Sequence, residues 1–176
     1  MLLESGVPVD ERPEGSPSAL MWAARYGHTD AVRALLEGGA QTALKNKSGW
    51  TALTDAAWHG HTEAVRALVE GGADAGYRSP DGMCPLRIAA QRGHAEAVAV
   101  LAKATDVDAG NGEALMAAAW NGHVEAVRAL VVAGVTLDAA AADGTTALKI
   151  AQTKKHEEVV KVLLDAGAGS DKGLEE

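Results

Sequence analysis

The sequence contains no phenylalanine and only one cysteine, and aromatic residues make up just 3% of its 176 residues. A single cysteine cannot form an internal disulfide, so nothing indicates an oxidising compartment. No apolar run approaches about 18 residues, and no charged segment followed by a short apolar one opens the chain. We therefore expect neither secretion nor a membrane span, and we expect a cytoplasmic location.

The sequence also lacks a surplus of positive charge. It has 16 Lys and Arg against 24 Asp and Glu, a formal net charge of −8. Binding to a nucleic-acid backbone requires a basic surface. We therefore expect no nucleic-acid partner, and no membrane partner either.

What the sequence does contain is a repeated segment, best seen in residues 49–73 (GWTALTDAAWHGHTEAVRALVEGGA). A Gly-His pair marks each copy, at intervals of 33, 33, 29 and 33 residues, with Lys-His in the last copy. Self-similarity at this period is typical of stacked supersecondary units, each unable to bury its apolar face alone. The five pairs are Gly27-His28, Gly60-His61, Gly93-His94, Gly122-His123 and Lys155-His156.

Each copy is predicted to fold as a helix, a turn and a second helix. Thr51 is a good N-cap for a short helix over residues 52–58, and Gly60 supplies a left-handed residue that ends it. Residues 62–70 have apolar side chains at helical spacing, and Gly71-Gly72 stop this second helix. Turn-forming residues then lead into the next copy.

This pattern resembles the ankyrin repeat over nearly the whole chain. The matching residues of two copies are Gly49-Trp50-Thr51-Ala52-Leu53, Ala56-Ala57 and Gly60-His61, and Gly82, Pro85-Leu86, Ala89-Ala90 and Gly93-His94. The resemblance implies an all-α repeat solenoid of stacked helix-turn-helix units, joined by β-turn or hairpin-like fingers. It also implies a non-enzymatic module that binds a protein or peptide, and we expect it to be a monomer.

One departure from the family is systematic, because its histidine in T-P-L-H never occurs. The threonine–histidine hydrogen bond of the family should therefore be missing. The residues at that position are Met21, Thr54, Arg87, Met116 and Lys149.

The repeats predict a single array over residues 1–168. It consists of a half-repeat (1–12), units at about 13–46, 47–78, 79–107, 108–140 and 141–168, and a flexible tail (169–176). Unit four carries Glu113 at the capping position, follows Thr105 in place of a glycine, and has a connecting turn four residues short. We expect the junction of units three and four to be the weakest in the array.

The histidines invite a metal-site interpretation, which the spacing disfavours. Stacked helices lie roughly 8–10 Å apart, too far for equivalent histidines to share one ion. We expect them to bridge loops by hydrogen bonds instead, and we expect no metal, no cofactor and no catalytic residue. Asp55 is the only acidic residue inside a first helix, and no second carboxylate accompanies it.

The resemblance implies that the variable positions lie at the turn tips and on the first helices facing a concave groove, and large residues at these positions form the predicted binding surface. Aromatic side chains on a solvent-facing surface are typical interface anchors. Trp22, by contrast, is expected to pack between the first unit and the N-terminal segment. The predicted partner-binding residues are Arg25, Tyr26, Trp50, Trp58, His59, Met83, Arg92, Trp120 and Asn121.

Two alternatives stay open. The chain could be a structural or regulatory segment of a larger repeat protein, as the half-repeat at its start suggests. It could also hold a small-ligand or catalytic site around Asp55, Trp58 and His59.

Overall fold

The computed structural model describes residues 8–105 and 111–169, and in these ranges it contains ten α-helices and no β-strand. The predicted all-α repeat fold is confirmed. The helices are α1 (Ala19–Arg25), α2 (Thr29–Glu37), α3 (Ala52–His59), α4 (Thr62–Glu70), α5 (Pro85–Arg92), α6 (Ala95–Ala104), α7 (Asn111–Asn121), α8 (Val124–Val132), α9 (Ala147–Lys154) and α10 (Glu157–Asp165).

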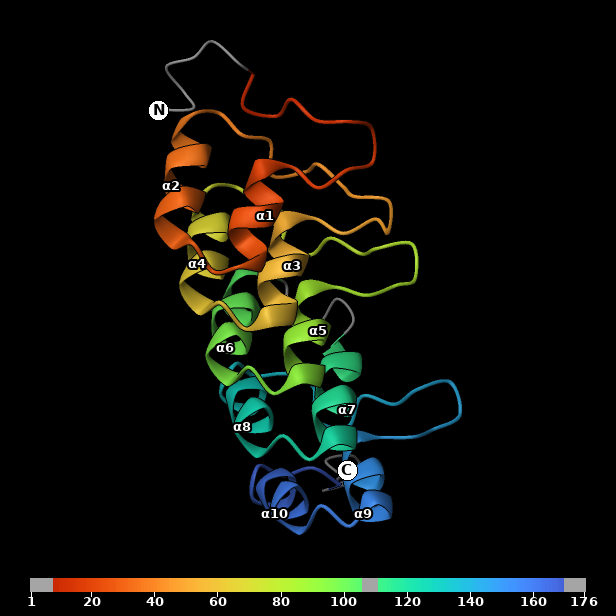
Figure 1. Cartoon of the computed structure of the whole chain (residues 1–176). Helices are drawn as coiled ribbons and strands as arrows, with labels where there is room; N and C mark the ends of the chain where they lie inside the picture. Colours follow the sequence, from red (N-terminus) through yellow and green to blue (C-terminus); the bar gives the residue numbers. More distant parts are fainter. Residues whose placement is uncertain (1–7, 106–110, 170–176) are drawn as a thin grey trace, which may run out of the picture. The chain divides into compact units, whose positions relative to one another are not determined.

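The chain packs as two compact blocks, an N-terminal block (Met1–Ala89) and a C-terminal block (Ala90–Glu176). We call α1, α3, α5, α7 and α9 the first helices, and the even-numbered ones the second helices. In the N-terminal block α1 packs on α3 and α2 on α4, which gives two layers (Figure 1). In the C-terminal block α7 packs on α9, and α8 packs on both α6 and α10.

Short helices hold together here because small side chains let them approach closely. Ala56, Ala57 and Ala64 have no exposed surface, and neither have Val65 and Leu68. Most of the helices also bury one leucine. The absence of phenylalanine is consistent with this close alanine-rich packing.

The first helices begin at capping side chains. The hydroxyl of Thr51 accepts from the backbone N–H of Thr54 at 3.3 Å, and the Thr54 hydroxyl accepts from the Thr51 N–H at 2.6 Å. Ser18 and Met21 form the same reciprocal pair at the start of α1. Met21 and Thr54, which stand where the resemblance leads one to expect histidine, thus close capping boxes.

The predicted fingers are tight turns. The N–H of Asn46 donates to the Trp50 carbonyl at 3.0 Å, and the N–H of Ser79 donates to the Met83 carbonyl at 2.9 Å. Fingers of the N-terminal block are joined by a bond from the Tyr77 hydroxyl to the Gly49 carbonyl at 2.6 Å. Within the described residues the only strand-like pairing is an isolated bridge between Ala140 and Thr146.

The predicted capping residue of the fourth unit is wrong. α7 begins at Asn111 and has 11 residues, against seven or eight in the other first helices, so Glu113 lies in its first turn and is not the N-cap. A carboxylate there interacts favourably with the helix dipole. One of the three proposed defects at this junction is therefore absent, whereas Thr105 does end α6 in extended backbone (φ −110°, ψ 154°).

Several predictions fall partly on residues 1–7, 106–110 and 170–176, which lie outside the described residues. They are the helix end of the half-repeat, most of the shortened turn and all but one residue of the tail. The remaining residue, Gly169, donates its N–H to the Asp138 carboxylate at 2.8 Å. Across the part of the chain that the structure describes, no helix has both the length and the apolar character to cross a bilayer.

Candidate functional site

Three histidines bridge successive repeats. The Nε2 atom of His61 lies 3.1 Å from the carbonyl oxygen of Arg25, in the last turn of α1. In the C-terminal block, His123 makes the same contact with the Gln91 carbonyl and His156 with the Trp120 carbonyl, each at 3.1 Å. A carbonyl oxygen only accepts, so each Nε2 carries the proton and donates. The predicted loop-bridging role is confirmed for these three.

These bonds satisfy carbonyl groups that a helix end would otherwise leave without a partner. Close approach of the imidazole depends on glycine in the preceding repeat. A Cβ on Gly27 would lie 2.6 Å from Nδ1 of His61, and one on Gly122 would lie 2.8 Å from Nδ1 of His156. Both glycines also have positive φ (69° and 72°), where a side chain is strained. The Gly-His pair is thus the link from one repeat to the next.

The end of α1 carries an exposed aromatic cluster. The rings of Trp22 and Tyr26 stack with centroids 5.8 Å apart, and the guanidinium of Arg25 lies 5.7 Å from the Trp22 ring. Trp22 is 43% exposed and Tyr26 60% exposed. The prediction that Trp22 packs between the first unit and the N-terminal segment is therefore wrong, and Trp22 belongs with the predicted residues Arg25 and Tyr26.

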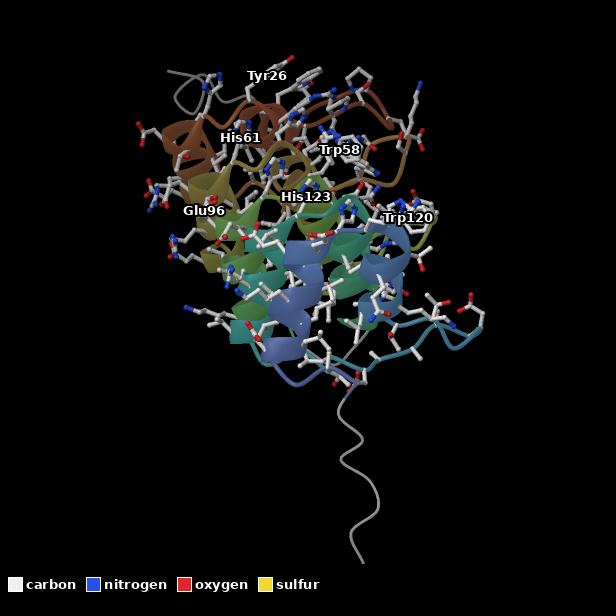
Figure 2. The ribbon with its side chains drawn as sticks, turned by 90° about the horizontal axis from the view of Figure 1, so that it is seen from below. Tyr26, Trp58, His61, Glu96, Trp120 and His123 are labelled. Carbon is white, nitrogen blue, oxygen red and sulfur yellow. The ribbon has the colours of Figure 1, made fainter. Side chains whose placement is uncertain are left out.

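Trp50 and Trp58 face each other and are not free anchors. Their ring centroids lie 5.2 Å apart, and both side chains are half-buried. Met83, at the end of the next finger, is also half-buried. His59 is exposed, with its ring stacked on that of His61 at 5.9 Å (Trp58 and His61 are labelled in Figure 2). Trp50 and Trp58 therefore contribute to packing between a finger and a first helix.

In the C-terminal block the exposed predicted residues lie at the ends of α5 and α7. Trp120 is 55% exposed, and the ammonium of Lys154, from α9, lies 3.5 Å from its ring centroid. Asn121 and Arg92 are exposed as well. Figure 2 labels Trp120 together with His123, whose bond to Gln91 places the ends of α5 and α7 beside each other.

One ionisable group of the first helices is buried, in an environment that the sequence does not predict. Asp55, on α3, is only 4% exposed. Burial raises the pKa of its carboxyl group to about 6, although the charge of Arg25 lowers it in part. The sequence could not show this, because Arg25 and Asp55 are brought together only by the packing of α1 on α3. A lone carboxyl group of this kind does not form an acid–base pair.

The second helices present a different surface, covered by charged residues of both signs. Arg66 pairs with Glu63 at 3.5 Å and Arg128 pairs with Glu125 at 3.4 Å, as their spacing predicts. All four side chains are largely exposed, so each pair contributes little. Two apolar residues stand out on this surface, Val132 at 87% and Leu164 at 52% exposure.

The side chains described in the structure include no group of three or more His, Cys, Asp or Glu arranged to hold a metal ion. The one cysteine, Cys84, is a half-buried free thiol just before α5. Packing within the repeats therefore does not explain why aromatic and basic side chains are exposed on the first helices.

Comparison with known proteins identifies a matching family. A family model described as ankyrin repeats (3 copies) matches residues 1–79, 71–140 and 86–175. No curated protein matches the chain significantly.

Proposed function

The chain belongs to the ankyrin-repeat family, and we propose that it is a non-enzymatic module that binds a partner protein or peptide through the exposed side of its first helices. Ankyrin repeats generally serve as protein–protein interaction modules. The nine predicted residues and Trp22 are the proposed contact residues, in two classes. Arg25, Tyr26, His59, Arg92, Trp120, Asn121 and Trp22 are exposed and contact the partner directly, whereas Trp50, Trp58 and Met83 are half-buried and contribute less of the contact surface.

The observation that carries the proposal is the exposure of large aromatic rings on the first helices. Trp22, Tyr26 and Trp120 are each between 43% and 60% exposed, although the chain has only four Trp and two Tyr residues. Leaving this much apolar ring surface in water is unfavourable, by about 25 cal/mol for each Å². Trp and Tyr are also the residues that most often dominate binding energies at protein interfaces.

A second observation is that one position on the first helices varies between repeats while the residues beside it do not. The residue two before each Gly-His pair is Arg25, Trp58, Gln91 or Trp120 in the first four repeats. The alanines just before it are buried in every one of these repeats. A position that changes while its neighbours keep the stack intact is free to serve a partner. We propose further that the protein acts as a monomer in the cytoplasm, where a free thiol such as Cys84 stays reduced.

A random peptide library displayed on phage tests the proposal without knowledge of the natural partner. Peptides selected on the intact chain are remeasured against two first-helix variants, Trp120→Ala and the double variant Trp22→Ala with Tyr26→Ala. The matched control is Val132→Ser with Leu164→Ser, which removes exposed apolar surface from the second helices.

We expect each selected peptide to lose at least about tenfold in affinity with one of the two first-helix variants, the usual cost of removing a central anchor. We expect less than a twofold change with the control. If the control weakens binding and both first-helix variants leave it unchanged, the binding surface lies on the second helices and the proposal is wrong.

A further inference from the structure

Charge is distributed unequally between the two sets of helices. Counting Lys and Arg against Asp and Glu from each first helix through its Gly-His or Lys-His pair gives a surplus of positive charge, most of it in repeats three and five. The second helices have a surplus of negative charge, which includes Glu157, Glu158 and Asp165 on α10. The first helices are thus basic when taken together, in a chain whose net charge is −8, although α3 and α7 each contain a single acidic residue and no Lys or Arg.

In the C-terminal block, basic side chains lie next to an exposed aromatic ring at a place that we call the Trp120 corner. It consists of Trp120, Lys154 and Lys155, with Arg92 alongside. The bond from His156 to the Trp120 carbonyl holds the end of α9 against the end of α7, and the bond from His123 to Gln91 does the same for α5. Three successive helix ends therefore present their side chains together.

All three basic side chains of the corner are exposed. The ammonium of Lys154 lies over the Trp120 ring at 3.5 Å. Within the described residues neither Lys154 nor Lys155 has a carboxylate at ion-pair distance. The only acidic residue on α7 is Glu113, in the first turn and so at the opposite end of the helix from Trp120.

Helix dipoles explain part of this pattern but not all of it. Arg92 and Lys154 lie in the last turns of α5 and α9, where a cation interacts favourably with the partial negative charge of a helix end. That partial charge amounts to about −0.5 for each helix. The two full positive charges of Lys154 and Lys155 outweigh the partial charge at the end of α9, so the corner keeps a positive surplus available to a ligand.

We propose that the Trp120 corner binds an acidic peptide segment, in which carboxylates pair with Lys154 and Lys155 while an apolar side chain packs on the Trp120 ring. This rests on the proposed function and names the partner's chemistry. The acidic second helices repel a long polyanion such as nucleic acid, whereas a short acidic segment can contact the corner alone. The indole supplies the apolar contact that exposed ion pairs lack.

The same peptide selection provides the test, through the composition of what it returns. We expect the peptides to be enriched in Asp and Glu around a large apolar residue. The strongest peptide is then synthesised in two forms, one as selected and one with every Asp and Glu replaced by Asn and Gln. Affinities are measured by fluorescence anisotropy at low and physiological salt.

We expect the amidated form to bind at least about tenfold more weakly, and Lys154→Gln to weaken the acidic form by about fivefold. Lys161→Gln, an exposed lysine of α10, is the matched control and should change affinity less than twofold. Because Trp120 and Lys154 are exposed, thermal unfolding of each variant should match the parent chain.

Three results would overturn the inference. Equal affinity for both peptide forms, together with loss of binding in Trp120→Ala, removes the acidic preference and leaves the proposed function standing. If Lys161→Gln and Lys154→Gln weaken binding equally, the peptide responds to the overall charge of the protein and not to a site at the Trp120 corner. If a single-stranded oligonucleotide displaces the acidic peptide at a concentration below that of the peptide, the corner binds nucleic acid. If no first-helix variant affects any selected peptide, the proposed function itself fails.

Discussion

The residue just before the histidine of each repeat is glycine in four repeats and Lys155 in the last. Replacing Lys155 by glycine should stabilise the protein, whereas replacing one of the glycines by alanine should destabilise it. Lys155 has φ 60° and ψ 35°, and it is the only described residue other than glycine with positive φ. The sequence predicts this conformation, because the same position is glycine in the other four repeats. The equivalent Gly122 has φ 72° and contacts His156 of the last repeat.

The magnitude for Lys155→Gly follows from two opposing terms. Relief of the left-handed conformation stabilises by about 1–2 kcal/mol, and the greater freedom of glycine in the unfolded chain costs about 0.4–1 kcal/mol. We therefore expect the free energy of unfolding to rise by about 0.5–1 kcal/mol. Gly122→Ala adds the same backbone strain and places a Cβ 2.8 Å from the His156 ring. Loss of the bond from His156 makes the expected cost about 2 kcal/mol or more.

Urea unfolding monitored by circular dichroism measures both effects. With a slope of about 1–3 kcal/mol per molar urea, the midpoint should rise by a few tenths molar for Lys155→Gly and fall by about 1 M for Gly122→Ala. Gln152→Gly, at an exposed interior position of α9, is the control and should cost about 1 kcal/mol. A midpoint that falls for Lys155→Gly would show that its left-handed conformation carries no strain, and an unchanged midpoint for Gly122→Ala would show that the account of the Gly-His link is wrong.

Three further predictions concern stability. Because burial raises the pKa of Asp55 to about 6 from an unfolded value near 3.9, stability from this group is present at low pH and lost as pH rises through 6. Asp55→Asn should therefore gain more stability over the parent at pH 7.5 than at pH 4, by up to about 2–3 kcal/mol; equal gains at both pH values would contradict this. Trp58→Ala should cost about 2 kcal/mol, since its half-buried ring packs on Trp50, and Trp120→Ala less than about 0.5 kcal/mol; similar losses in urea midpoint would refute the distinction. Amide exchange should be faster in α6, which ends in extended backbone at Thr105, than in α4. Equal protection of the two helices would show that the junction of units three and four is not the weakest in the array.

The sequence was sufficient to predict the helices, because their period and punctuation are local properties. The 33-residue interval, the capping threonine at Thr51 and the left-handed glycine at Gly60 each act on nearby backbone. The start of α7 could not be found in this way. The shorter connection brings Asn111 and Gly112 into the helix, and nothing in the local pattern marks that earlier start.

The candidate surface was less predictable, because it depends on contacts between repeats. The sequence identifies Trp58 and Trp120 as equivalent positions, but only packing shows that one is half-buried against Trp50 and the other exposed. The contact between Lys154 and Trp120 joins residues that are 34 positions apart in the sequence. It forms because α9 packs on α7.

The most direct test of the central claim, that the exposed side of the first helices binds a partner, is a nuclear magnetic resonance titration. The indole N–H signals of all four tryptophans are followed as a selected peptide is added to the intact chain, with backbone amides of α8 and α10 as reference. We expect the indole signal of Trp120, or that of Trp22 on α1, to shift saturably while the reference amides stay in place. Shifts confined to α8 and α10, with every indole signal unchanged, would contradict the account.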